Sequence, residues 1–289
     1  MGLLYPSEIT ESYAMAGKVK AERPAPKTLL LAIFAGIFVA AGGAVSNTAA
    51  HAVENASLAR LISGLIFPFG LGMIMLTGTE LFTGNCLLSI SVLSRRTTVA
   101  RMAKNLSLVY LGNCLGAVAT AAAAVYMGQL DLSGGALAAY TIKVAAAKCA
   151  LPFGPALVSA VFCNILVCFA VLCSLSAKDT SGRILGAYLG VSFFVIAGFE
   201  HCVANAYYVP AGLLALTVPR YADLAAASGI DTAALTAGRF LLSNMVPVTL
   251  GNLLGGVLVG AVMWGCYGQK DAKAAPESGK AGRGISVGP

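Results

Sequence analysis

The sequence predicts an all-α integral membrane protein with six transmembrane spans, and three properties of the 289-residue chain lead to this class. Hydrophobic residues make up 58% of the chain and charged residues only 11%, whereas soluble domains carry about 25% charged residues. The mean hydropathy is +0.81. Six nearly uncharged stretches are each long enough to cross a bilayer, which takes roughly 17 to 25 apolar residues.

The two ends of the chain are more polar than its middle. Residues 1–27 are expected to form a cytoplasmic amphipathic segment, because Pro6 is typical of a helix start and Ile9, Tyr13 and Ala16 would share one helix face. Such a helix either anchors at the membrane surface, which we prefer, or plugs the mouth of a pore. It lacks an apolar core with a cleavage site, so we expect no cleaved signal peptide. Residues 269–289 predict a disordered cytoplasmic tail.

Residues 28–268 are interpreted as one six-span channel domain. The second and fifth stretches are too long for one simple helix, and each contains glycine and proline near its middle. We therefore expect both to be discontinuous helices that are interrupted near the membrane centre. The six stretches cover residues 28–50, 61–93, 106–127, 149–177, 184–217 and 240–267.

Lysine and arginine are distributed unevenly about these spans. Fourteen lie on the side that holds both termini, and five lie on the other side, at Arg60, Lys143, Lys148, Arg220 and Arg239. The positive-inside rule then places both termini in the cytoplasm, in agreement with an even number of spans. The sequence predicts a multi-pass protein of the cell membrane.

The fifth span contains the most informative motif, in which Glu200 and His201 stand side by side. No other charged residue or histidine occurs from Ile184 to Thr217. An ionisable group at the bilayer centre costs at least about 2.5–3.5 kcal/mol, so such groups face a bundle interior or a pore. His201 is either a buried structural histidine or, as we prefer, a pore residue that donates to an anion or delivers a proton to it.

The two halves of the chain match each other at sparse positions. Glu80 and Asn85 in the second span have the same spacing as Glu200 and Asn205 in the fifth. A second shared pattern is found in the third and sixth spans, at Asn105, Gly112, Asn113, Leu115 and Gly116 and at Asn244, Gly251, Asn252, Leu254 and Gly255. Three spans per repeat imply that the repeats, 28–128 and 149–268, are inverted. Inverted repeats place two broken helices at one central site, where free N–H groups and positive helix ends favour anions.

These motifs resemble those of the formate/nitrite transporter family. The resemblance covers roughly residues 5–268, and its most specific parts are Glu-Leu-Phe-Thr-Gly-Asn at 80–85, Phe-Glu-His-x-Val-Ala-Asn at 199–205 and Pro-Val-Thr-Leu-Gly-Asn at 247–252. It implies a homopentamer of aquaporin-like protomers, each with a pore for formate, nitrite, lactate or hydrosulfide. The chain as a whole looks most like the hydrosulfide-channel branch. Cys202 and Ala206 depart from the serine and methionine common in formate and nitrite members.

The resemblance also implies roles for individual residues. Thr83 would face His201 across the pore, Leu81 and Phe194 would form the cytoplasmic constriction, and Phe67 would contribute to the outer one. Polar positions along the path match Lys148, Asn164 and Asn252. Without the resemblance, Phe67, Leu81 and Phe194 are equally compatible with core or lipid-facing positions, and Lys148 with a lysine that reaches the membrane surface.

Other polar residues are interpreted as structural. Glu80 and Glu200 are poor anion ligands and are expected to bind backbone donors or to pair between elements, while Asn85 and Asn205 would cap the helix breaks. Asn252 would bridge helices or reach the pore. The eight cysteines form no C-x-x-C pair, so we expect buried free thiols, no disulfide framework and no metal site.

The preferred function is a channel for small monovalent anions of weak acids, with hydrosulfide as the first choice, followed by formate or nitrite. The alternative is a neutral-solute pore of the aquaporin type, which would need two Asn-Pro-Ala motifs, and the sequence contains none. A membrane enzyme is disfavoured, because the chain has only two histidines and no nucleotide-binding loop. We expect the small anion, the lipid bilayer and further copies of the chain as partners, with no cofactor and no nucleic acid.

Overall fold

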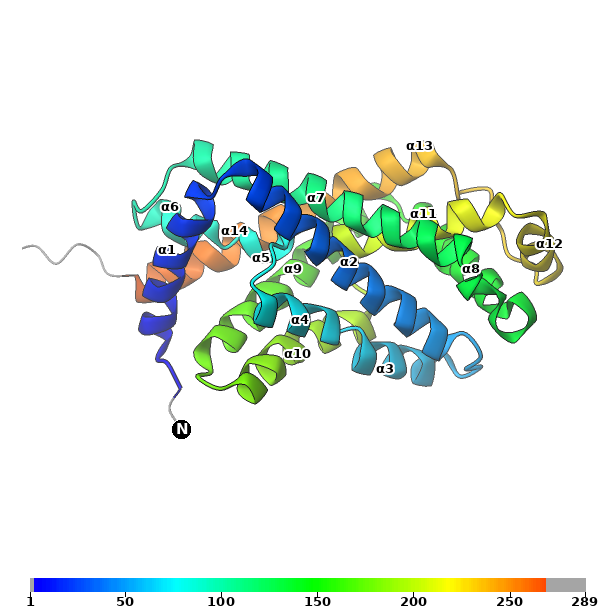
Figure 1. Ribbon diagram of the computed structural model, residues 1–289, viewed down its shortest axis with the longest axis horizontal. Helices are drawn as coiled ribbons and strands as arrows, with labels where there is room; N and C mark the ends of the chain where they lie inside the picture. The colour runs from blue at the N-terminus through cyan, green and yellow to red at the C-terminus, as the bar shows by residue number, and fades with distance from the viewer. Residues whose placement is uncertain (1–2, 269–289) are drawn as a thin grey trace, which may run out of the picture.

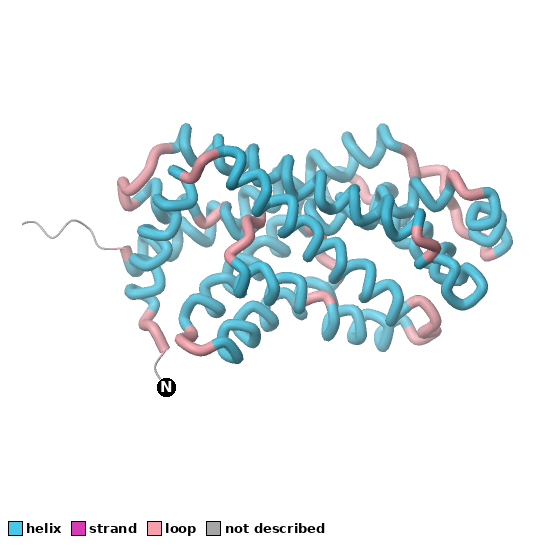
Figure 2. Tube along the Cα trace, viewed as in Figure 1, coloured by secondary structure: helices cyan, strands magenta, loops and turns pink. Residues whose placement is uncertain are grey.

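The structure is a computed structural model that describes residues 3–268, and in this part most residues are helical and no strand is formed (Figures 1 and 2). A short 3₁₀ segment, Gln129–Gly135, precedes α8, and a π-helix, Phe240–Met245, precedes α14. The helices are α1 (Pro6–Glu22), α2 (Ala25–Ala50), α3 (Ala56–Ile66), α4 (Phe69–Thr77), α5 (Phe82–Asn85), α6 (Leu88–Leu93), α7 (Val99–Tyr126), α8 (Ala136–Ala150), α9 (Phe153–Ser176), α10 (Thr180–Ala197), α11 (Cys202–Leu216), α12 (Pro219–Ala227), α13 (Ala237–Arg239) and α14 (Val246–Tyr267).

Six helical segments of the described chain are long and apolar enough to cross a membrane, which confirms the predicted class and number of spans. They cover Ala25–Ala50, Ala56–Thr77, Val99–Tyr126, Phe153–Ser176, Thr180–Ala197 and Ala237–Tyr267. The fifth stretch continues as α11, which bends by 100° into α12. The predicted tail, residues 269–289, lies outside the described residues.

Both long stretches are broken, as the sequence predicts. Gly78 ends α4 and Gly198 ends α10, with φ angles of 70° and 77°. Glycine adopts this left-handed conformation without the steric cost that a side chain brings, and it is the usual residue just after a helix end. The chain then runs extended to Leu81 and to His201, where α5 and α11 begin. Each half of the molecule therefore has one interrupted helix.

The unbroken spans pack in matching pairs, α2 against α7 and α9 against α14. In Figure 1, α2 and α7 run side by side along the molecule. A Cβ atom on Gly116 of α7 would lie 2.1 Å from the Ile33 carbonyl oxygen, and one on Gly255 of α14 would lie 2.3 Å from that of Val161. Glycine at these two positions lets the backbones approach as closely as they do.

The first helix, α1, packs on one end of the molecule and not apart from it (Figure 1). Ile9 and Tyr13 are buried, as their shared face predicts, whereas Ala16 is exposed. The Tyr13 hydroxyl donates to the carbonyl oxygen of Gly84 in the broken span at 2.9 Å. The interpretation of α1 as a surface anchor is therefore incomplete, because the helix also holds the segment that follows the first break.

Candidate functional site

The two helix breaks meet at Thr83 and His201. Thr83 lies in α5, just after the first break, and His201 is the residue that precedes α11. The Oγ1 atom of Thr83 and the Nε2 atom of His201 are 3.1 Å apart. Both side chains are buried, with exposed fractions of 0% and 3%. One polar contact thus joins the halves of the chain at the centre of an apolar body.

The second ring nitrogen of His201 defines its protonation state. The backbone N–H of Ala204 donates to Nδ1 at 3.1 Å, so this nitrogen accepts and carries no hydrogen. The neutral ring then has its hydrogen on Nε2, the atom that faces Thr83. A second hydrogen on Nδ1 would be directed at the N–H of Ala204. This contact favours a neutral imidazole that donates through Nε2.

Aromatic rings cover one side of this pair. The ring of Phe194 stacks on His201 with centroids 5.7 Å apart, and Phe67 meets Phe194 edge to face at 5.9 Å. These three residues and Lys148 line a cavity of about 160 Å³, which we name the Lys148 cavity. Arg60 also lines it.

Leu81 lines a different cavity. This second cavity has a volume of about 90 Å³ and is also lined by Lys20 and Tyr13, and we name it the Lys20 cavity. The structure therefore groups Phe194 with Phe67, whereas the resemblance grouped it with Leu81. The physical reason is their position about the breaks: Phe67 and Phe194 each lie before a break, whereas Leu81 follows the first break.

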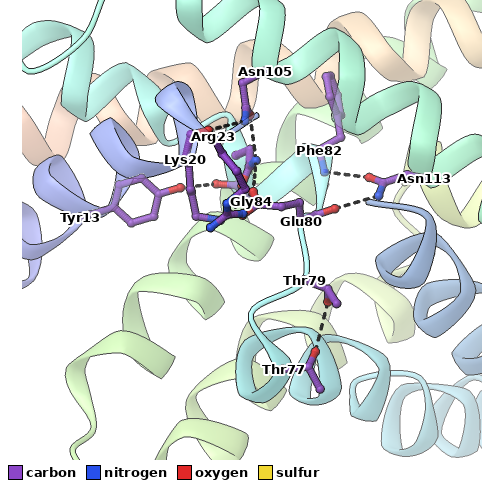
Figure 3. A network of polar contacts seen from close by, with 11 residues as sticks. Tyr13, Lys20, Arg23, Thr77, Thr79, Glu80, Phe82, Gly84, Asn105 and Asn113 are labelled. Carbon is purple, nitrogen blue, oxygen red and sulfur yellow. Dashed lines mark hydrogen bonds and ion pairs between the residues drawn. The ribbon is translucent and has the colours of Figure 1, made fainter. Parts of the chain in front are cut away.

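A network of polar side chains joins α1 to the first break (Figure 3). The Lys20 ammonium lies 2.9 Å from Oε2 of Glu80, and Arg23 pairs with the same carboxylate. The amide nitrogen of Asn85 donates to Glu80 at 2.6 Å and to Oδ1 of Asn105 at 2.9 Å. Asn105 in turn donates to the carbonyl oxygen of Lys20 at 3.1 Å. Glu80 is buried, and two cations balance its charge.

The second break has a network of the same connectivity. Lys148 of α8 pairs with both oxygens of Glu200, at 3.0 and 3.2 Å. Asn205 donates to Glu200 at 2.6 Å and to Asn244 at 2.8 Å, and Asn244 donates to the carbonyl oxygen of Lys148 at 2.9 Å. Unlike Glu80, Glu200 is paired with a single cation within residues 3–268. Both glutamates pair between elements, which was one of the two arrangements expected from the sequence.

The two networks show that α1 and α8 hold equivalent positions in the two halves of the molecule. Lys20 and Lys148 occupy equivalent places in them, although both residues lie outside the repeat limits expected from the sequence. Lys20 precedes Ala32 by the same number of residues as Lys148 precedes Ala160, and each alanine carbonyl accepts from an equivalent asparagine, Asn113 or Asn252. In Figure 1, α1 and α8 lie at opposite ends of the molecule.

Asn252 and Asn164 stabilise the second break and the Thr83 segment. Asn252 accepts from the N–H of Cys202 at 2.9 Å and donates to the carbonyl oxygens of Ala160 and Glu200. Asn164 donates to the carbonyl oxygens of Thr83 and Asn252, at 3.2 and 2.5 Å. Neither asparagine lines the two cavities.

These bonds change one expectation drawn from the sequence. Free N–H groups were expected at the start of the second half-helix, but Asn252 and His201 already bind those of Cys202 and Ala204. The reason is that a buried backbone donor without a partner is costly, so side chains satisfy it. The positive end of the α11 dipole remains.

Sequence reasoning missed several residues of the site. Lys20 and Arg23 were counted only as topology signals, and Asn105 and Asn244 only as parts of a repeat. Lys20 and Lys148 lie equally far before α2 and α9, but the spans expected from the sequence begin at residues 28 and 149, so this equal spacing became visible only in the structure. Within residues 3–268, no group of three or more His, Cys, Asp or Glu side chains is arranged to hold a metal ion.

Comparisons with known proteins agree on one family. The family model described as formate/nitrite transporter matches residues 7–265. The chain is 34% identical to the uncharacterized transporter YrhG of Bacillus subtilis (strain 168), over 94% of this chain and 96% of that protein. It is 30% identical to the formate channel FocA of Escherichia coli (strain K12), over 92% of this chain and 95% of that protein. A solved structure titled as a pentameric formate channel with formate bound superposes with a TM-score of 0.75 at 31% identity, covering 84% of this chain and 97% of that chain.

Proposed function

Because this chain belongs to the formate/nitrite transporter family, and is therefore a membrane channel for small anions and not an enzyme, we propose that formate is its main permeant. Several relatives carry the name formate channel, and this supports formate over the hydrosulfide favoured by sequence reasoning. Nitrite and hydrosulfide remain further candidates, since they are small monovalent anions of weak acids. The observation that carries the proposal is the buried Thr83–His201 pair, of which His201 lines the Lys148 cavity, while Leu81 and Gly84, close to Thr83 in the chain, line the Lys20 cavity.

The proposed path runs from one lysine cavity to the other through the central pair. Arg60 pairs with no carboxylate within residues 3–268, and Lys20 and Arg23 together exceed the charge of Glu80. Each cavity thus retains positive charge at the edge of an apolar, low-dielectric body, and this charge attracts an anion. Phe67 and Phe194 on one side and Leu81 on the other form apolar constrictions at which the anion loses water. Thr83 and the Nε2–H of His201 then donate to it. In this proposal His201 acts as a neutral donor, because the Ala204 N–H opposes protonation of Nδ1.

The orientation and assembly are also proposed. Both termini lie in the cytoplasm, so the Lys20 cavity opens inward and the Lys148 cavity outward; the placement of lysine and arginine supports this. The assembly is a homopentamer with one pore in each protomer, which is supported by the pentameric formate channel of similar structure. Residues 28–268 form the channel domain, to which α1 contributes Lys20.

Anion flux into proteoliposomes tests the function. Formate, nitrite, hydrosulfide and chloride are compared at several pH values in the wild type and in His201→Ala. We expect saturable flux of the weak-acid anions, and a loss of at least about tenfold in the variant, because a hydrogen bond to a charged partner is removed. The matched control is His51→Ala, since His51 is the one other histidine and binds Thr48 and Ser133 away from the central pair. Unselective leakage that His201→Ala leaves unchanged would contradict the proposal.

A further inference from the structure

The Lys148 cavity contains a buried polar side chain that none of the contacts described so far involves. Asn47 of α2 lines this cavity and is only 5% exposed. Its amide nitrogen has no hydrogen-bond partner among the residues that the structure describes. Other side-chain atoms in this state, on Ser89, Thr97, Ser174 and Asn205, belong to residues that do not line the Lys148 cavity.

An unsatisfied donor at this place indicates a missing partner. Buried amides in proteins are nearly always hydrogen-bonded, because leaving a donor unpaired is unfavourable. The amide nitrogens of Asn164 and Asn252 follow this rule, with carbonyl acceptors. Since Asn47 lines a cavity next to the central pair, the acceptor it lacks can be an anion that occupies this cavity.

The cations of the same cavity already have partners. Lys148 is bound to Glu200, and Arg60 donates to the carbonyl oxygens of Ile196 and Ala197 at the end of α10, at 3.4 and 3.3 Å. Arg60 therefore supplies positive charge, whereas Glu200 balances that of Lys148, and both cations have fewer free donors to offer. Asn47 provides the donor that remains unused.

The chemistry of this donor discriminates between the candidate permeants. Formate and nitrite each have two oxygen atoms, so one can accept from Asn47 while the other stays available to the rest of the path. Sulfur is a weak hydrogen-bond acceptor, and hydrosulfide has only one such atom. We propose that Asn47 is a specificity-determining residue that binds the permeant oxyanion in the Lys148 cavity and selects formate and nitrite over hydrosulfide. This inference rests on the anion-channel function proposed above.

Comparison of the two repeats shows that this donor occurs in the Lys148 cavity and has no equivalent in the Lys20 cavity. Asn47 follows Ala32 by the same number of residues as Leu175 follows Ala160, and Leu175 lines the Lys20 cavity. The equivalent position of the second cavity thus offers an apolar side chain and no donor. Asn47 acts on anions that enter through the Lys148 cavity.

Transport kinetics of Asn47→Leu and Asn47→Ala test this role. The apparent KM for formate and for nitrite is expected to rise roughly tenfold, and that for hydrosulfide by less than about twofold. The rise is expected for entry through the Lys148 cavity, measured in intact cells, and not for entry from the other side, measured in inverted vesicles. Thr48→Val is the matched control, because Thr48 is the next residue of α2 and does not line the cavity.

The outcomes separate this inference from the function on which it rests. A wild-type protein that carries none of these anions would overturn both. A wild type that carries them, with equal changes for all anions or no change in the Asn47 variants, would overturn the role of Asn47 alone. The stability of each variant is measured by unfolding in detergent. If Asn47→Leu does not assemble, the kinetics of Asn47→Ala, whose side chain is smaller than that of asparagine, decide the test.

Discussion

His201 uses its two ring nitrogens for different purposes. Nδ1 accepts the N–H of Ala204 and so fixes the start of α11, while Nε2 faces Thr83. The stacked ring of Phe194 further limits rotation of the imidazole. Because one nitrogen is tied to the backbone, the other keeps the same direction whether an anion is present or not, and a donor that is already oriented loses little entropy on binding.

The Thr83 hydroxyl can be tested by replacement with a side chain of the same shape. We expect Thr83→Val to reduce formate flux roughly five- to tenfold, because Nε2 of His201 loses its partner and the permeant loses a donor. Thr83→Ser should restore most of the flux. Thr249→Val is the control, since Thr249 pairs with Tyr110 and lines neither of the two lysine cavities. Equal flux in Thr83→Val and wild type would remove Thr83 from the path.

The sequence was informative about residues that belong to spaced motifs. Glu80, Asn85, Glu200 and Asn205 were identified by spacing, and each lies at a helix break. Their partners could not be predicted, because the bonds join segments far apart in the chain: Lys20 and Asn105 are 85 positions apart. Asn47 gave no signal at all, since an isolated asparagine in an apolar span belongs to no motif.

At the scale of elements, α1 and α8 each supply one lysine to a buried glutamate. The two ends differ, however, in the number of cations. Glu80 has Lys20 and Arg23, whereas Glu200 has Lys148 alone within residues 3–268. A buried carboxylate without a counter-charge is strongly destabilising, so the two lysines should not be equally important for stability.

We therefore expect Lys148→Met to destabilise the folded protein by up to about 3 kcal/mol, and Lys20→Met by clearly less, because Arg23 still balances Glu80. Unfolding of the detergent-solubilised protein measures both effects. The double variant Lys148→Met, Glu200→Gln removes the unpaired charge and should recover most of the stability but not the anion flux. Equal losses for the two single variants would contradict this account of the networks.

The π-helix before α14 has a clear origin in the repeat. Asn105 and Asn244 make equivalent bonds, and Thr98 and Thr236 make equivalent caps, by accepting from Arg101 and Arg239. Asn244 follows its threonine by one residue more than Asn105 does. The wider π-turn at Phe240–Met245 accommodates this extra residue and keeps Asn244 in register with Asn205.

Single-residue deletions test this explanation. Leu242 is exposed and lies in the π-helix, so its deletion should convert the segment to an ordinary α-helix and leave assembly and flux largely intact. Deletion of Ala103 from the matching turn of α7 should turn Asn105 by about 100° and break its bonds to Asn85 and Lys20. Yield of the intact oligomer and formate flux are the measurements. The reverse order of tolerance would mean that the π-turn has another cause.

The whole molecule combines two related halves, but its centre is unsymmetrical. The networks and glycine contacts recur in both halves, whereas His201 corresponds to Leu81 when each is counted from its neighbouring glutamate. Repetition therefore builds the scaffold and the two lysine cavities, and single substitutions create the polar pair. This explains why spacing in the sequence predicted the fold and the breaks well, while the grouping of Phe67 with Phe194 required the structure.

Two natural cysteines allow the orientation of the molecule to be tested. Cys173 in α9 and Cys266 in α14 are exposed, and the end of α9 carries the Ser176 carbonyl that accepts from the N–H of Leu4 at 3.0 Å. In Figure 1, α12 lies at the other end of the long axis from α1. With cytoplasmic termini, a membrane-impermeant maleimide should label inverted vesicles at these two cysteines and leave intact cells unlabelled. The variant lacking both cysteines should lose this labelling.

The exposed Ser228, just after α12, provides the control for the other end. In a background without Cys173 and Cys266, Ser228→Cys should react in intact cells. Labelling of Cys266 in intact cells, together with protection of Ser228→Cys, would reverse the orientation. The Lys148 cavity would then open to the cytoplasm, and the oxyanion selection that we assign to Asn47 would act on anions that leave the cell. The orientation thus decides which direction of transport depends on the chemistry of the anion.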